Sequence, residues 1–215
     1  MSSAIRALIL DFGGVLTRDQ PSHLVDEMAR LAGLPIDAFR SRYWRHRADY
    51  DGGLTGLEYW TRVLDGVDAT EDTIEQLIEA DAASWSDFRP DMWELAAAFR
   101  ARGGRTAILS NGVPEIIARI RSRRHLETWF DAVVVSCEVG RCKPDPAVFH
   151  HACTSVGVEP TSVLMVGDTP ADAGAVDAGC QVLILPASPP GAVHGLDAAL
   201  TLALGRPLPD RGDHD

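Results

Sequence analysis

The stretch Ile5–Thr17, IRALILDFGGVLT, decides the fold class because a continuous apolar run ends there at a carboxylate and two glycines. The run ALIL (Ala7–Leu10) has no polar alternation, which is typical of a strand buried on both faces of a parallel sheet. Asp11 closes the run, and Gly13 and Gly14 follow it. Taken alone, Asp11 is as consistent with the start of a turn as with a functional carboxylate, since Asp and Gly are ordinary turn residues.

Four further apolar runs recur along the chain, and segments with helical periodicity separate them. The runs are TAIL (Thr106–Leu109), AVVV (Ala132–Val135), VLMV (Val163–Val166) and VLIL (Val182–Leu185). The expected helices are Asp91–Arg102, Pro114–Arg123, Asp145–Val156 and Pro170–Ala178. Strands that alternate with helices through right-handed crossovers predict an α/β fold with a Rossmann-like, doubly wound parallel sheet.

One segment breaks this alternation, from Pro21 to Ser86. It contains helical patterns such as HLVDEMARLAGL and TEDTIEQLIEADAASW, and no convincing buried strand. Because the segment is too long for a simple loop, we expect an α-helical cap inserted after the first strand. The predicted division is a Rossmann-like core of residues 1–17 and 87–205, a cap of residues 18–86, and a disordered tail of residues 206–215.

Composition limits the classes of partner. The 215 residues carry 20 basic and 31 acidic side chains, a net charge of -11, and no dense basic cluster that would favour nucleic acid or an anionic membrane. No apolar stretch approaches the ~20 residues that span a bilayer. The N-terminal apolar run is too short for a signal peptide and ends in Asp11, so we expect a soluble, cytoplasmic protein. Composition does not indicate the oligomeric state.

Polar side chains follow three of the expected strands: Asp11, Ser110 and Asp168. Ligands of an open parallel sheet bind beyond the carboxyl ends of its strands, so we expect these side chains to share one crevice. Asp168 and Asp172 flank Pro170, which places both carboxylates near a helix N-terminus, although helix capping would also explain Asp168. Three converging carboxylates repel one another unless they bind a hard cation, for which Mg²⁺ is the best candidate.

Two further features favour a phosphate site. Ser110 and Asn111 in ILSNG offer hydroxyl and amide donors for phosphate oxygens, although a plain turn is the alternative. Lys143 in RCKPDP is the single lysine in a chain with nineteen arginines. Arginine and lysine are not interchangeable where a compact point charge is needed, so we expect a functional ammonium here in preference to an ordinary salt bridge.

These motifs in this order, from LILDFGGVLT through ILSNG and CKPDP to VGDTPADAGA, resemble the haloacid dehalogenase-like (HAD) hydrolase superfamily, subfamily IA with a helical C1-type cap. The resemblance implies that Asp11 is a nucleophile that forms an aspartyl-phosphate. It implies that Ser110 binds the transferring phosphoryl group and that Lys143 steadies both. It also implies Mg²⁺ held by Asp11, the backbone carbonyl of Gly13 and Asp168, with Asp172 in support.

Gly13 departs from the pattern of the resembled phosphatases, in which a second Asp protonates the leaving group and later activates water. Three alternatives stay open: a Mg²⁺-dependent phosphatase acting on a small organic phosphate monoester, a 2-haloacid dehalogenase, and a catalytically weak binding or regulatory protein. Asp11, Lys143, Asp168 and Asp172 together favour the phosphatase. If the missing acid limits the rate, Gly13→Asp should raise turnover on alkyl phosphates.

Substrate choice is expected to lie in the insertion, where YDGGLTGLEYW (Tyr50–Trp60) is the segment expected to face the site. The candidates to line its entrance are Trp44, Arg47, Asp49 and Asp51. Ordinary packing and surface roles are the alternative for each of them.

Overall fold

A computed structural model describes residues 4–185 and shows one five-stranded sheet. The strands are β1 (Ala7–Leu10), β2 (Arg105–Ser110), β3 (Ala132–Val135), β4 (Val163–Gly167) and β5 (Gln181–Ile184). Their order is β3-β2-β1-β4-β5, and every neighbouring pair is parallel. The predicted α/β class is therefore confirmed, with strand bounds within two residues of the apolar runs.

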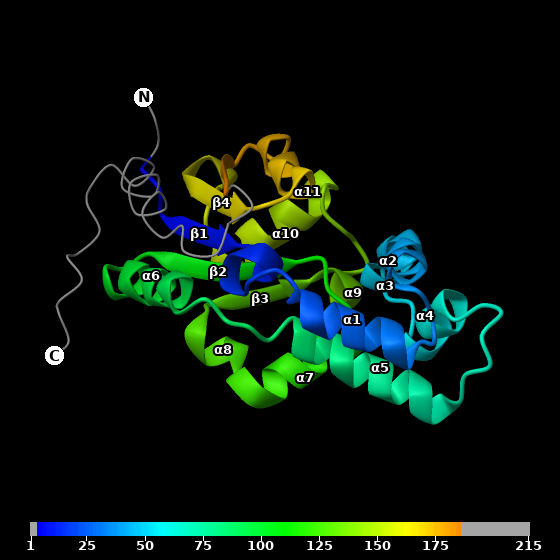
Figure 1. The fold of residues 1–215 in the computed structure, drawn as a ribbon. Coiled ribbons are helices and arrows are strands. Elements are labelled where there is room, and N and C mark those ends of the chain that lie inside the picture. The colour runs from blue at the N-terminus through cyan, green and yellow to red at the C-terminus, as the bar shows by residue number, and fades with distance from the viewer. Residues whose placement is uncertain (1–3, 186–215) are drawn as a thin grey trace, which may run out of the picture.

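Helices cover both faces of the sheet, which explains why its strands are apolar without alternation. Leu8 and Leu10 belong to one buried cluster, and their neighbours Ala7 and Ile9 belong to another. Successive side chains of a strand point to opposite faces, so each face has its own core. Figure 1 shows α10 on one side of the sheet and α7 and α8 on the other.

The helices that follow the insertion are α6 (Pro90–Ala101), α7 (Pro114–Arg124), α8 (Leu126–Trp129), α9 (Ser136–Val139), α10 (Pro146–Val156) and α11 (Pro170–Ala173), with short turns η2 (Pro160–Ser162) and η3 (Gly174–Val176). Of these helices, α6, α7 and α10 match predicted segments, α11 covers only the start of one, and the short helices α8 and α9 were not predicted. Pro114 and Pro170 occupy the first helical turn, as expected. The segment predicted to run as one helix to Ala178 instead breaks at Gly174, after which a tighter turn begins.

The insertion consists of helices, as predicted. They are α1 (Ser22–Leu31), α2 (Ile36–Arg45), α3 (Arg47–Asp51), α4 (Gly56–Val63) and α5 (Glu71–Ser84). The chain leaves and returns side by side, because Thr17 bridges Phe88 and Arg18 N donates to Asp87 O at 2.7 Å. We propose this crossing as the base of a cap of residues 18–86. The expected tail of residues 206–215 and the end of the expected core, residues 186–205, lie outside the described residues.

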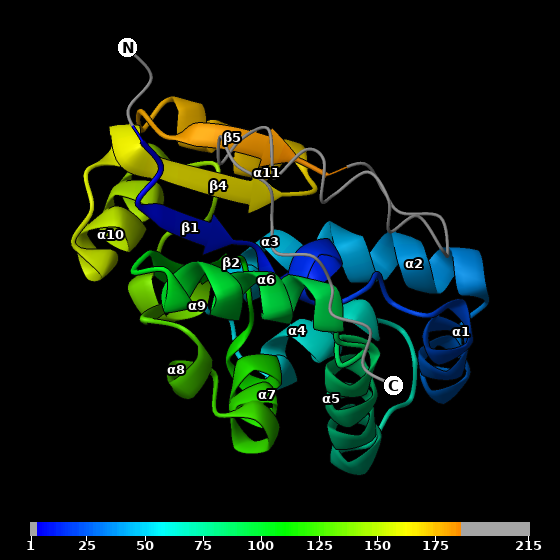
Figure 2. The ribbon, with the colours of Figure 1, turned by 90° about the vertical axis from the view of Figure 1, so that its left-hand side faces the viewer.

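The carboxyl ends of the strands face the insertion. Figure 2 shows the arrows of β1 and β4 pointing toward the side of the molecule where α1 and α2 lie. From β1 the chain adds β2 and β3 on one side of β1, and it then crosses to add β4 and β5 on the other side. The strand order therefore reverses at the end of β1. Ligands of such sheets bind at this point. None of the described helices is long and apolar enough to cross a membrane.

Candidate active site

Asp11 lies directly after β1, and its side chain is only 10% exposed. Its backbone N–H donates to Val166 O at 2.9 Å, which continues the pairing of β1 with β4 and positions the residue. Asp11 Oδ1 accepts from Phe12 N at 2.7 Å and lies 2.8 Å from Lys143 Nζ. Burial raises the pKa of Asp11 to about 7 although the Lys143 ammonium opposes the shift.

Lys143 connects two of the carboxylates. Its Nζ lies 2.8 Å from Asp11 Oδ1 and 2.6 Å from Asp172 Oδ1, and the residue is 4% exposed. Burial acts to lower the pKa of Lys143, but attraction to Asp11 and Asp172 outweighs it and the net pKa shift is upward. The ammonium is therefore charged and held between Asp11 and Asp172, at the strand ends where the single lysine was expected to act.

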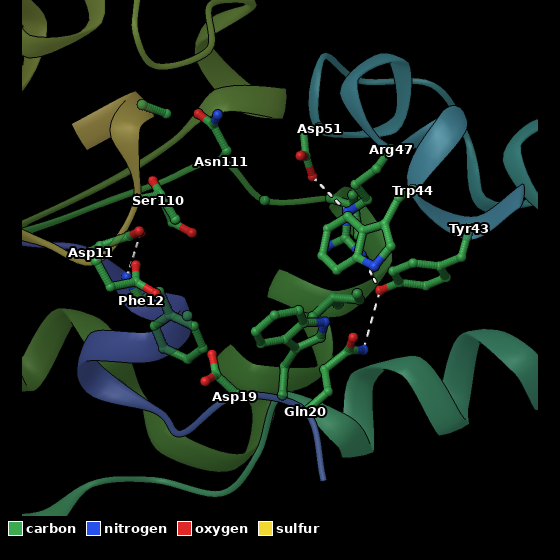
Figure 3. A pocket seen from close by; sticks show the side chains of 18 of the residues that line it. Asp11, Phe12, Asp19, Gln20, Tyr43, Trp44, Arg47, Asp51, Ser110 and Asn111 are labelled. Carbon is green, nitrogen blue, oxygen red and sulfur yellow. Dashed lines mark hydrogen bonds and ion pairs between the residues drawn. The ribbon is translucent and has the colours of Figure 1, made fainter. Parts of the chain in front are cut away.

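Asn111 holds Lys143 in place through both ends of its side-chain amide. Asn111 Oδ1 accepts from Lys143 N at 2.8 Å, and Asn111 Nδ2 donates to Lys143 O at 3.0 Å. These two bonds position the Lys143 backbone, and Asn111 also lines the cavity, so its contact with a phosphate stays a prediction. Ser110, at the end of β2, is buried and lines the same cavity as Asp11 (Figure 3).

Three carboxylates converge, as the strand order predicted. One oxygen each of Asp11, Asp168 and Asp172 lies within 4.8 Å of the others. Asp168 Oδ1 is buried without a hydrogen-bond partner. Burial and the Asp172 charge raise the pKa of Asp168 to about 6. An unpartnered buried oxygen among hard oxygen donors fits a divalent cation such as Mg²⁺.

Asp172 differs from the other two carboxylates because both of its oxygens have protein partners. Oδ1 binds Lys143 Nζ, while Oδ2 accepts from Thr169 N at 3.0 Å and from Thr169 Oγ1 at 2.7 Å. Burial acts to raise the pKa of Asp172, but Lys143 and Thr169 outweigh it and the pKa is lowered. Asp172 is thus ionised and holds Lys143 and the loop of Asp168 and Thr169 in position, which agrees with the expectation that it supports the metal ligands.

Gly14 fits closely under Asp168. A Cβ atom built on Gly14 would lie 2.0 Å from Asp168 Oδ2, and its φ of 71° is in the left-handed region that favours glycine. The second glycine of DFGG is therefore required by the approach of the Asp168 carboxylate to the backbone.

Gly13 faces Trp85, which follows α5. A Cβ atom built on Gly13 would lie 2.9 Å from Trp85 Cζ3 and 3.4 Å from Cε3. The indole fills the space that a side chain at position 13 would need. This contact revises the expectation that Gly13→Asp alone raises turnover, because the carboxylate could enter only if Trp85 moved. The sequence has no signal for it, since it depends on how α5 returns to the sheet.

A cavity of about 640 Å³ joins these residues to the insertion. Of the four cap candidates, Trp44, Arg47 and Asp51 line the cavity. Asp49 does not, and its expected place at the entrance is wrong: its carboxylate binds Arg62 Nη1 at 2.8 Å on the exposed side of the cap. Cavity-lining residues that sequence analysis missed include Asp19, Gln20, Arg40, Tyr43 and Trp85.

Arg47 is the centre of a buried network above the site. Its Nε lies 2.9 Å from Asp51 Oδ1, its Nη1 lies 3.8 Å from Asp81 Oδ2, and Nη1 also donates to Tyr43 Oη. Tyr43 Oη in turn donates to Asp81 Oδ1 at 2.8 Å, and Gln20 Nε2 donates to Ser84 Oγ at 2.7 Å. Figure 3 shows Tyr43, Arg47 and Asp51 on the cap side, opposite Asp11 and Ser110.

Sequence relatives carry both phosphatase and dehalogenase names. The chain is 40% identical to a phosphoserine phosphatase of Thermus thermophilus, but over 81 residues only, which are 38% of this chain and 32% of that protein. It is 25% identical to a phosphatase of Mycobacterium tuberculosis over 77% of this chain and 79% of the relative. It is 28% identical to (S)-2-haloacid dehalogenase 1 of a Pseudomonas species over 81% of each chain.

Solved structures share the fold. A HAD-like family hydrolase from Porphyromonas gingivalis has a TM-score of 0.72 at 20% identity and covers 94% of this chain and 98% of its own. A HAD family enzyme from Bacteroides thetaiotaomicron, in complex with magnesium and inorganic phosphate, has a TM-score of 0.72 at 16% identity, with 87% and 98% covered. The family model of haloacid dehalogenase-like hydrolases matches residues 5–178, and the chain belongs to this family of hydrolases.

Proposed function

We propose that this chain is a Mg²⁺-dependent phosphatase that hydrolyses a small organic phosphate monoester through an aspartyl-phosphate on Asp11. The observation that carries the proposal is the buried Asp11 carboxylate, which binds Lys143 and lies beside Asp168 and Asp172. The phosphatase names of two relatives, and the magnesium and phosphate bound by a structural neighbour, support it.

Each residue has a separate part in the proposed reaction. Asp11 attacks phosphorus, the P–O bond to the alcohol breaks, and water protonates the departing alkoxide. Ser110 donates its hydroxyl to a phosphoryl oxygen, and Lys143 orients Asp11 and offsets charge on the phosphoryl group. A second water hydrolyses the aspartyl-phosphate and restores Asp11.

Asp11, Asp168 and the Gly13 backbone carbonyl would hold Mg²⁺, with Asp172 in support. The ion would supply electrostatic stabilisation of the phosphoryl oxygens. The unpartnered Asp168 Oδ1 supports this choice of ligands.

The test is phosphate release from aryl and sugar phosphates by the purified chain, with and without Mg²⁺. We expect activity that requires Mg²⁺ and is lost in Asp11→Asn. Activity that persists after chelation, or in Asp11→Asn, would contradict the proposal.

A 2-haloacid dehalogenase is the second candidate, favoured by the similarity to the Pseudomonas enzyme. A halide leaves without a proton, which suits a site with glycine at position 13. Chloride release from 2-chloropropionate without added metal would support this candidate. Failure of both assays would favour the third alternative, a binding or regulatory protein.

A further inference from the structure

The cavity extends from the carboxylates into a region lined by apolar side chains, which we call the apolar chamber. Six helix residues of α1, α2 and α7 line it: Val25, Met28, Phe39, Ile116, Ile117 and Ile120. None is more than 9% exposed. The apolar chamber is therefore formed by two helices of the insertion, α1 and α2, together with α7.

The volume of the cavity exceeds what the proposed chemistry occupies. At about 640 Å³ it lies within the range of roughly 300–1,000 Å³ that is usual for sites binding small organic ligands. A phosphoryl group and a cation need only the end formed by Asp11, Ser110 and Lys143. Water gains few hydrogen bonds from the walls of the apolar chamber, so an apolar ligand is the favoured occupant.

The charges around the cavity argue against a second anionic group on the substrate. Arg47 already pairs with Asp51 and Asp81, and Lys143 already pairs with Asp11 and Asp172. Arg40 also lines the cavity, but it is exposed. Among the described lining residues, no buried cation is left for a distal carboxylate or phosphate.

We propose that the apolar chamber binds the alcohol part of the substrate, so that the substrate is the phosphate monoester of an apolar, phenol-like alcohol. The inference rests on the proposed function and specifies its substrate class. Aromatic side chains of Phe39, Tyr43, Trp44 and Trp85 line the cavity and suit a ring. The phenolate leaves as the P–O bond breaks, takes its proton from water, and needs less help from a protein acid than an alkoxide does.

A series of 4-alkylphenyl phosphates tests the chamber separately from the chemistry. Alkyl groups from methyl to hexyl lengthen the substrate while hardly changing the acidity of the phenol. Each methylene buried in the apolar chamber should raise kcat/KM about fourfold, the equivalent of ~0.8 kcal/mol, until the space is filled. A value of kcat/KM that is independent of chain length would overturn the inference.

Ile117→Phe provides the structural control, because it narrows the chamber without touching the carboxylates. We expect it to abolish the gain from longer chains, and circular dichroism with a cooperative thermal unfolding transition shows separately that the variant is folded. Ile74→Phe is the matched control: Ile74 is 8% exposed and Ile117 6%, but Ile74 does not line the cavity. An equal loss of chain-length dependence in both variants would contradict the assignment.

Calorimetric titration with non-hydrolysable 4-alkylphenylphosphonates in Mg²⁺ separates the two proposals. If phenyl phosphate is turned over but chain length affects neither kcat/KM nor Kd, the phosphatase proposal stands and the assignment of the apolar chamber as the alcohol site is wrong. Absence of turnover with Kd falling along the series removes the phosphatase proposal but supports an apolar ligand in the chamber. If there is neither turnover nor a change of Kd along the series, both the phosphatase proposal and the apolar-chamber proposal are overturned.

Discussion

Gly13→Asp should fail to install a general acid unless Trp85 is also removed. The Cβ of any side chain at position 13 lies 2.9 Å from Trp85 Cζ3, whereas favourable carbon contacts are about 3.5–4.0 Å. Overpacking of this kind costs typically about 1–3 kcal/mol, which for a chain of this size lowers Tm by roughly 2–12 °C. A well-placed general acid contributes about 10²–10⁴ in rate.

The assay is phosphate release from ethyl phosphate, whose alkoxide leaves poorly, alongside 4-nitrophenyl phosphate, whose phenolate leaves well. We expect Gly13→Asp to lower Tm and to change kcat on ethyl phosphate by less than about tenfold. The double variant Gly13→Asp/Trp85→Ala should raise kcat on ethyl phosphate by about 10²–10⁴ and affect 4-nitrophenyl phosphate much less.

Two matched controls separate crowding from acid catalysis. Gly13→Ala crowds Trp85 without adding a carboxylate, and Trp85→Ala opens the space without adding an acid. Gly13→Ala should lower Tm as Gly13→Asp does, and Trp85→Ala alone should not raise turnover of ethyl phosphate. A gain of 10² or more in Gly13→Asp alone would refute the argument from the contact between Gly13 and Trp85.

Three further predictions concern the polar groups. Because Mg²⁺ needs ionised ligands and the pKa values of Asp11 and Asp168 are raised to about 7 and about 6, Mg²⁺ affinity measured by calorimetry should fall as pH decreases from 7 to 6; an unchanged affinity would exclude these ligands. Lys143→Met leaves buried carboxylates unpaired, so urea denaturation without Mg²⁺ should show a loss of about 3–5 kcal/mol, and a loss below 1 kcal/mol would contradict the buried pairing. Asp19 lines the cavity and contributes to the raised pKa of Asp168. If Asp19 relays a proton to the leaving group, Asp19→Asn should lower kcat on ethyl phosphate more than on 4-nitrophenyl phosphate, and equal losses on both substrates would exclude Asp19 as a proton relay.

The arrangement of the sheet and the meeting of the carboxylates followed from sequence for the same physical reason. Parallel strands buried on both faces are continuous apolar runs, and their carboxyl ends share one edge. Asp11 and Asp168 could therefore be placed together although 157 positions separate them, and the structure brings them within 4.8 Å. The single lysine pointed to the same place, and Lys143 lies there.

Contacts that depend on the path of loops and helix ends were not predictable in this way. The amide of Asn111 holds the Lys143 backbone because the two loops run side by side. Trp85 covers Gly13 because the end of α5 lies beside the loop that follows β1. Asp49 and Asp51 are neighbours in one short helix, yet only Asp51 lines the cavity, since a helix turns its successive side chains to different sides.

The most direct test of the central claim is detection of the aspartyl-phosphate. The chain would be mixed with 4-nitrophenyl phosphate and Mg²⁺, quenched in acid during turnover, and digested for mass spectrometry. We predict one added phosphoryl group on the peptide that contains Asp11, and none in Asp11→Asn. Turnover with no phosphorylated peptide at the earliest times, or with the phosphoryl group on another residue, would contradict the account.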